Sequence, residues 1–153
     1  MNSMVKDAYA RIMQTGKLRE GGVVGCSEEE IAQIEHHFGH RLPETYRSFL
    51  RLMGKKAGNC FVGTDMFFDK LRVLKEYASD LLAEGNSGLE LKENDFVFSV
   101  HQGYQFLFFE ANEDQPDPAI CYYSEGMFSF EEKYSSFSTY LLSAIEDFSR
   151  ILS

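Results

Sequence analysis

Three histidines close together in the sequence offer the nearest approach to a metal site. His36 and His40 are four residues apart, and His37 lies between them. On a helix the rings of His36 and His40 lie one turn apart, a spacing that can hold Zn²⁺. A zinc site needs further ligands aimed at the same point, and the adjacent Glu35 faces another direction on a helix. A solvated or partly packed histidine cluster explains the pattern better, so we predict no metal and no other cofactor.

Nucleophilic catalysis is the second chemistry that the residue types allow. His101 offers a base, and Cys26, Cys60 and Cys121 are the nucleophiles that it would activate. Cys121 lies in an apolar segment that predicts a buried strand, where a thiol behaves as a small apolar group. The chain has no Gly-x-Ser-x-Gly elbow, and its glycine-rich segment 21–25 lacks the lysine of a phosphate-binding loop. We therefore predict that the chain is not an enzyme; a metal-dependent hydrolase that uses the histidines is the enzymatic alternative.

Acidic side chains dominate the second half of the chain. Residues 1–75 hold 12 Lys/Arg and 9 Asp/Glu, whereas residues 76–153 hold 3 and 15, giving net charges of +3 and −12. An acidic half repels nucleic-acid phosphates, and it attracts a basic protein and speeds the encounter. The simplest alternative is that these charges only keep the domain soluble. The carboxylates lack the regular spacing of a calcium loop, so a protein partner with a basic surface is the favoured prediction.

The candidate partner-binding residues combine these carboxylates with a histidine and a tyrosine at a strand end. Carboxylates on loops between strands can pair with Arg or Lys of the partner, and nearby aromatic side chains can supply apolar anchors. Core packing is the alternative for those aromatics. His101 can equally bond a backbone carbonyl, and Gly103 beside it can simply supply a positive φ. The predicted partner-binding set is Glu110, Glu113, Asp114, Asp117, Glu125, His101 and Tyr104.

Helical periodicity organises the first half of the chain. Apolar residues at helical spacing predict a helix over residues 3–15, and the glycines of segment 16–25 then predict a loop. Ser27 followed by Glu30 is a capping-box pattern that starts a second helix, and Gly39 supplies its C-terminal stop. Two further helices are predicted, one from Pro43 in its first turn to Gly54 and one over residues 70–84.

The period changes to two in the second half, which indicates strands. Residues 96–111 are predicted to form a hairpin around the turn Gln102-Gly103-Tyr104. A third strand is predicted over 119–124 and a fourth over 127–132, while the polar segment 112–118 is an expected exposed loop. Ser136 can cap a last helix with a wide apolar face. The expected fold is a single α+β domain over 1–153, with a twisted antiparallel sheet of about four to six strands flanked by N-terminal and C-terminal helices.

Two stretches of the chain form a recognisable pattern. The first stretch, residues 31–54, carries Ile31, Ile34, Glu35, Leu42, Pro43, Tyr46, Phe49, Leu50 and Gly54. The second stretch is the hairpin 96–111, followed by Asp117-Pro118, by YYSEG at 122–126 and by Phe137-Ser138 at the start of the last helix. Together they resemble the SUKH superfamily, which includes the yeast cell-wall synthesis regulator and many bacterial immunity proteins. The resemblance covers about residues 27–152.

The resemblance implies a twisted antiparallel sheet with flanking helices, and it implies binding rather than catalysis. Bacterial members bind and neutralise toxins, often nucleases, whereas fungal relatives act as intracellular regulators. The favoured expectation is a bacterial immunity protein that blocks a toxin by occlusion through an acidic face. The alternative is a regulatory or scaffold domain that binds an endogenous protein.

Membrane and export signals are not expected. No stretch approaches the ~20 apolar residues that a membrane span needs, and the first residues lack the apolar core of a signal peptide. The three cysteines are odd in number and far apart, which suggests no disulfide framework. A reducing cytoplasm is therefore the expected compartment.

Overall fold

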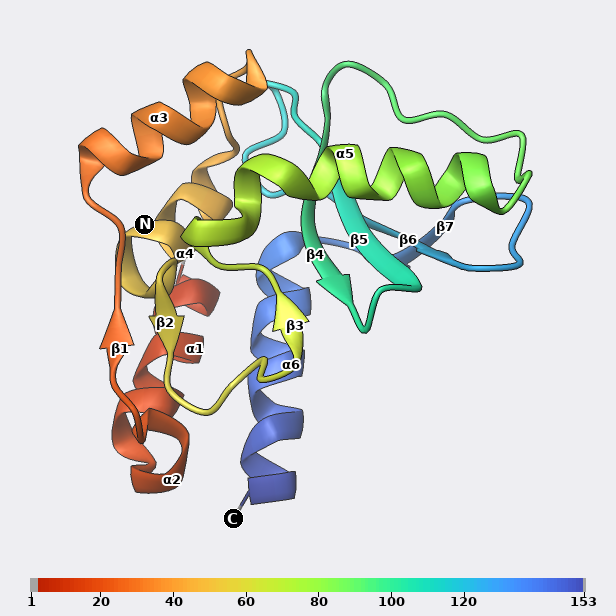
Figure 1. Cartoon of the computed structure of the whole chain (residues 1–153). Helices are drawn as coiled ribbons and strands as arrows, with labels where there is room; N and C mark the ends of the chain where they lie inside the picture. Colours follow the sequence, from red (N-terminus) through yellow and green to blue (C-terminus); the bar gives the residue numbers. More distant parts are fainter. Residues whose placement is uncertain (1–2, 153) are drawn as a thin grey trace.

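A computed structural model describes residues 3–152 as helices packed around a main antiparallel sheet, with a second sheet of two short strands (Figure 1). The α+β prediction is confirmed. The elements in chain order are α1 (Ser3–Gln14), α2 (Gly16–Arg19), β1 (Val23–Val24), α3 (Glu28–Phe38), α4 (Glu44–Met53), β2 (Lys56–Ala57), β3 (Thr64–Asp65), α5 (Phe68–Glu84), β4 (Asp95–His101), β5 (Gln105–Glu110), β6 (Ile120–Ser124), β7 (Glu131–Tyr134) and α6 (Phe137–Leu152).

The main sheet has five strands in the order β3-β4-β5-β6-β7, and every neighbouring pair is antiparallel. Alternation along β5 separates its side chains between the two faces. Phe109 lies on the face toward α4 and α6, where its ring centroid is 5.2 Å from that of Tyr46. Phe106 points to the other face with Tyr123, which lies against Gly85 at the end of α5. The sheet is therefore covered by α5 on one face and by α4 and α6 on the other.

Tyr46 on α4 is the centre of an aromatic core. Its side chain is fully buried, and its ring centroid lies 5.3 Å from that of Phe96 and 5.2 Å from that of Phe137. Such ring pairs contribute about 0.5–1.5 kcal/mol each beyond the apolar area that they bury. The Tyr46 hydroxyl has no hydrogen-bond partner among the described residues, and burial raises the pKa of Tyr46 well above its usual value.

The glycine-rich segment after α1 is more ordered than the sequence suggested. Its prediction as a loop over 16–25 was wrong in part, because it forms the short helix α2 and the strand β1, which pairs with β2. Two-residue strands and a single helical turn are too short to leave a periodic pattern in the sequence. Leu18 of α2 is fully buried, so this segment contributes to the core.

The helix boundaries follow the predicted signals closely. The capping box at Ser27 is present, since Ser27 Oγ accepts from the Glu30 amide at 3.1 Å and Glu30 accepts from the Ser27 amide at 2.9 Å. Gly39 ends α3 with φ of +88°, as expected for a left-handed cap. Pro43 lies one position earlier than predicted, as the residue before α4 rather than in its first turn, because its ψ of 150° is extended.

The last strand and the long loop differ from the sequence-based expectation. β7 begins at Glu131, later than the predicted 127–132. Phe130, which precedes it, packs on Phe108 at a ring-centroid distance of 4.8 Å. β7 forms one edge of the sheet, and its residues 131–133 are exposed. The loop 112–118 is exposed as predicted over 112–116, whereas Asp117 is half-buried and Pro118 is buried.

The capping carboxylates of α3 predict how stability depends on pH. Hydrogen bonds from Lys55 and then from the Ser27 amide hold the pKa of Glu30 below its usual 4.5. A carboxylate with a lowered pKa contributes stability above about pH 4.5 that is lost as pH falls through the lowered pKa. The difference in unfolding free energy between the wild type and Glu30→Gln, measured in urea, should therefore become smaller as pH falls from about 6 to about 3.

Glu29→Gln provides the matched control for that titration. Glu29 lies in the same exposed first turn of α3, so it shares the helix dipole with Glu30. At neutral pH, Glu29→Gln should differ less from the wild type in its free energy of unfolding than Glu30→Gln does. Equal effects of the two variants at every pH would show that Lys55 and Ser27 do not stabilise α3 through Glu30.

Candidate functional site

The seven predicted partner-binding residues lie at opposite ends of the sheet. His101 ends β4 and pairs with Gln105 at the start of β5, whereas Glu110 ends β5 and leads into the loop 111–119. A strand of this length spans about 20 Å. The structure therefore does not bring the seven residues into one site. We call the set Glu110, Glu113, Asp114 and Asp117 the loop end, and the set His101, Tyr104 and Glu125 the turn end.

Two of the four loop-end carboxylates are bound within the chain. Glu110 forms an ion pair with Lys92, and the hydrogen bond from Lys92 lowers the pKa of Glu110. Asp117 Oδ1 accepts from Thr45 Oγ1 at 3.0 Å and from the Ser138 amide at 2.9 Å. Asp117 thus joins the first turns of α4 and α6.

The other two loop-end carboxylates are exposed, and one of them has basic neighbours. Glu113 and Asp114 are exposed on the loop. Glu113 lines a cavity of about 290 Å³ together with Arg41 and Arg47. The opposite charges in this cavity weaken the electrostatic attraction that the loop end can exert on a basic partner.

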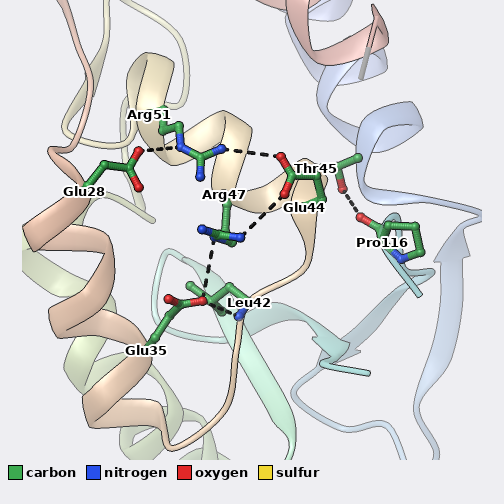
Figure 2. A network of polar contacts seen from close by, with 8 residues as sticks. All are labelled: Glu28, Glu35, Leu42, Glu44, Thr45, Arg47, Arg51 and Pro116. Carbon is green, nitrogen blue, oxygen red and sulfur yellow. Dashed lines mark hydrogen bonds and ion pairs between the residues drawn. The ribbon is translucent and has the colours of Figure 1, made fainter. Parts of the chain in front are cut away.

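A network of polar contacts beside the loop end holds α3 to α4 (Figure 2). Arg51 Nε lies 2.6 Å from Glu28, and Arg51 Nη1 lies 3.4 Å from Glu44. Arg47 contacts Glu44 at 3.6 Å and Glu35 at 3.8 Å. Because both arginines have glutamate partners in the chain, the network is a structural link between two helices rather than a site for an anion.

The turn end brings two hairpin turns side by side. The Glu125 amide donates to the Tyr104 carbonyl at 2.9 Å. Gly103 has φ of +80°, as its structural interpretation predicted, and its carbonyl accepts from Tyr77 Oη at 2.9 Å. His101 Nδ1 bonds the hydroxyl of Thr64 at 2.8 Å rather than the backbone carbonyl that its structural interpretation allowed. The neighbour strand β3, which carries Thr64, left no signal in the sequence.

A groove lies between α6 and the sheet beside the turn end, with a cavity volume of about 300 Å³. Its polar wall is on the sheet, where Tyr122 Oη donates to Gln105 at 3.1 Å. Its apolar wall comes largely from α6. We call it the α6 groove, and the residues that line it include Thr64, His101, Gln105, Leu107, Tyr122, Lys133, Tyr134, Ala144, Asp147, Phe148 and Ile151.

Only His101 among the groove residues was part of the predicted site. Lys133 Nζ lies 4.3 Å from the centroid of the Tyr122 ring, a cation–π contact that the sequence could not reveal. The wide apolar face predicted for the last helix was a usable signal for the groove. The structure leaves Phe148 half-buried and Ile151 75% exposed at the groove.

The three clustered histidines have separate neighbours. His37 Nε2 lies 3.0 Å from the Arg72 carbonyl oxygen, and His40 Nε2 lies 3.7 Å from Glu93. His36 is exposed. Within residues 3–152 no group of three or more His, Cys, Asp and Glu side chains is placed to hold a metal ion.

The cysteines differ from activated nucleophiles. Cys26 and Cys60 are buried, and desolvation raises the pKa of each thiol to about 11. Cys121 is half-buried, and desolvation again raises the pKa of its thiol. The reactive form of cysteine is the thiolate, so a raised pKa leaves these side chains protonated at neutral pH.

Comparison with known proteins gives one clear result. The family model SUKH_6, described as SMI1-KNR4 cell-wall, matches residues 28–141. This span runs from α3 into the first turn of α6, and it contains both resembling stretches of the sequence. No curated protein matches the chain. Over residues 3–152 the helices are too short or too polar to traverse a lipid bilayer.

Proposed function

Because the chain belongs to the SMI1-KNR4 cell-wall family described by SUKH_6, we propose that it is a non-catalytic protein-binding module. Its proposed role is that of an immunity protein, which binds a toxin in the cytoplasm and blocks it by occlusion. The observation that carries this proposal is the family match over residues 28–141, which includes both hairpin strands and the turns that join them.

The turn end is the proposed contact surface. Glu125 is exposed there, and we add to the turn end the exposed Glu131 and Glu132, which follow on β7. The loop end, in contrast, has Arg41 and Arg47 beside Glu113. A basic partner, such as a nuclease with a positive active site, is attracted more strongly by the turn end, where three exposed carboxylates outweigh the single charge of the nearby Lys133.

Aromatic side chains at the turn end support the same choice. Tyr104 is 40% exposed, and Phe128, in the turn that follows Glu125, is 74% exposed. Protein interfaces gain most of their affinity from a few large aromatic or arginine anchors. Tyr123 of β6, by contrast, is fully buried and belongs to the core.

Charge reversal at the turn end should weaken toxin binding. The change is Glu125→Lys with Glu131→Lys, and the measurement is a calorimetric titration with the purified product of the neighbouring gene at several salt concentrations. We expect the dissociation constant to rise about tenfold or more at low salt, because two attractive charges become repulsive. The difference should decrease as salt is raised, since exposed charges are screened.

The matched control is Glu113→Lys with Asp114→Lys, which changes the net charge by the same amount at the loop end. It should weaken binding much less than the turn-end variant. A larger effect of the loop-end variant would move the contact surface to the other end of the sheet. A dissociation constant that neither variant changes would contradict the proposal that exposed carboxylates attract the partner.

A regulatory role is the second candidate function, and the cell-wall description of the matching family favours it. In that case the partner is an endogenous protein rather than a toxin. Expression of the neighbouring gene's product without this chain separates the two functions. Growth arrest that this chain relieves supports immunity, whereas normal growth supports regulation.

A further inference from the structure

We propose that the α6 groove receives a large apolar side chain of the protein partner together with an adjacent carboxylate that pairs with Lys133. This inference rests on the proposed protein-binding function and specifies what the partner must present. It adds a local requirement for negative charge to a surface that otherwise attracts positive charge.

The size and lining of the groove fit one large apolar side chain. The cavity volume of about 300 Å³ exceeds that of a phenylalanine side chain, and Leu107, Phe148 and Ile151 form apolar walls. Ile151 is 75% exposed, so a partner side chain that covers it removes apolar surface from water.

Lys133 is the basic group at the groove that lacks a carboxylate partner. After residue 75 the sequence holds three Lys/Arg residues, namely Lys92, Lys133 and Arg150. Lys92 pairs with Glu110, and Arg150 pairs with Asp147. No carboxylate lies within ion-pair distance of Lys133 in the described part of the chain, where its Nζ lies over the Tyr122 ring.

The position of Lys133 makes this positive charge available to a partner. The Tyr122 ring covers one side of the ammonium group, while Tyr122 Oη is held by Gln105. An ammonium on an aromatic face has given up part of its hydration and keeps free donors on its other side. Electrostatic complementarity therefore calls for a carboxylate at this point of the interface, surrounded by basic residues that meet the acidic turn end.

The test uses short synthetic peptides and two-dimensional amide NMR of the isotope-labelled full chain. The probe is acetyl-Arg-Gly-Arg-Phe-Asp-Arg-Gly-Arg-amide. One variant peptide has asparagine in place of the aspartate, and another has glycine in place of the phenylalanine. We expect the probe to shift the amides of groove residues, Lys133 and Phe148 among them, with an affinity at least about tenfold higher than that of the glycine variant.

The asparagine variant tests the carboxylate separately. It carries more net positive charge than the probe, so general attraction to this acidic chain favours it. The proposal predicts the reverse order, with the asparagine variant binding about fivefold more weakly. Equal or tighter binding of the asparagine variant would overturn the proposal.

Matched protein variants test Lys133 itself. Lys133→Glu and Lys70→Glu change the net charge equally, and Lys70 is exposed on α5 and does not line the groove. Lys133→Glu should weaken probe binding about fivefold or more, and Lys133→Gln should weaken it less. Lys70→Glu should leave the affinity unchanged or slightly increase it. Equal affinities of the Lys133→Glu and Lys70→Glu variants would contradict the proposed ion pair.

The outcomes separate this proposal from the proposed function. If every peptide shifts amides around Glu125 and none shifts the groove, the groove proposal fails while the acidic turn end remains supported. If no peptide shifts any amide, the groove proposal fails, and the toxin titration still decides the proposed function. N-acetyl-phenylalanine that binds as tightly as the probe would reassign the groove to a free small molecule and overturn the proposal.

Discussion

Replacement of Gly58 by alanine should remove a large part of the folding stability of the chain. Gly58 has φ of +62°, and a Cβ at this position would lie 1.8 Å from the Leu18 carbonyl oxygen. The left-handed conformation costs a residue with a side chain about 1–2 kcal/mol. The clash adds more, because it is with backbone of α2, where the Asn59 amide also donates to Leu18 at 2.8 Å. We expect a total loss above about 4 kcal/mol, a large part of the stability of an ordinary domain.

Two other glycines separate the cost of the positive φ at Gly58 from the cost of the clash with Leu18. Gly16→Ala has neither a positive φ nor a neighbour within 4 Å of the added Cβ, and Gly63→Ala has a φ of +86° with no neighbour. Urea unfolding followed by circular dichroism should show almost no effect for Gly16→Ala and a loss of about 1 kcal/mol for Gly63→Ala. If Gly58→Ala were only as destabilising as Gly63→Ala, the close contact between α2 and the segment after β2 would be wrong.

Asp117→Ala should lower the free energy of unfolding by about 3 kcal/mol. The Asp117 carboxylate accepts hydrogen bonds from Thr45 Oγ1, the Ser138 amide and Ser138 Oγ. Ser138 is buried, so removal of the carboxylate leaves the Ser138 amide without its acceptor, whereas Thr45 Oγ1 keeps the Pro116 carbonyl at 3.1 Å. The adjacent Pro116 carbonyl accepts from the Thr45 amide at 3.1 Å, which shows that this loop segment caps α4 as well as α6.

Asp114→Ala is the matched control, because Asp114 lies on the same loop and is exposed. Thermal unfolding should show a large decrease in midpoint for Asp117→Ala and a small change for Asp114→Ala. Similar midpoints for the two variants would contradict the capping role of Asp117. The same structural role makes Asp117 unsuitable for a test of partner binding, since its replacement alters the fold.

Local signals in the sequence were sufficient for most of the fold. The capping pair Ser27 and Glu30, the stop at Gly39 and the hairpin turn at Gly103 each depend on residues close together in the chain. β3 could not be predicted, because its two residues pair with Val100 and His101 far along the sequence. Pairings of this kind depend on tertiary structure and leave no local period.

The candidate site was predicted less well than the fold. The sequence-based prediction placed Glu110 and Glu125 in one acidic face. Because β5 and β6 are antiparallel, however, Glu110 at the end of β5 and Glu125 after the end of β6 lie at opposite ends of the sheet. Asp117 looked like a loop carboxylate, and its bonds to Thr45 and Ser138 could not be inferred across such sequence separations. The groove was missed because it forms between α6 and the sheet, and Lys133 appeared only as one basic residue after two glutamates.

The charged edge strand β7 also affects how copies of this protein meet in concentrated solution. An unprotected edge invites a second sheet to continue the hydrogen-bond ladder, which is a common start of aggregation. Here two β7 strands paired in parallel register would bring Glu131 against Glu131 and Glu132 against Glu132. Repulsion between these carboxylates opposes the pairing of two β7 strands. The surface beside β7 therefore stays open to a different protein.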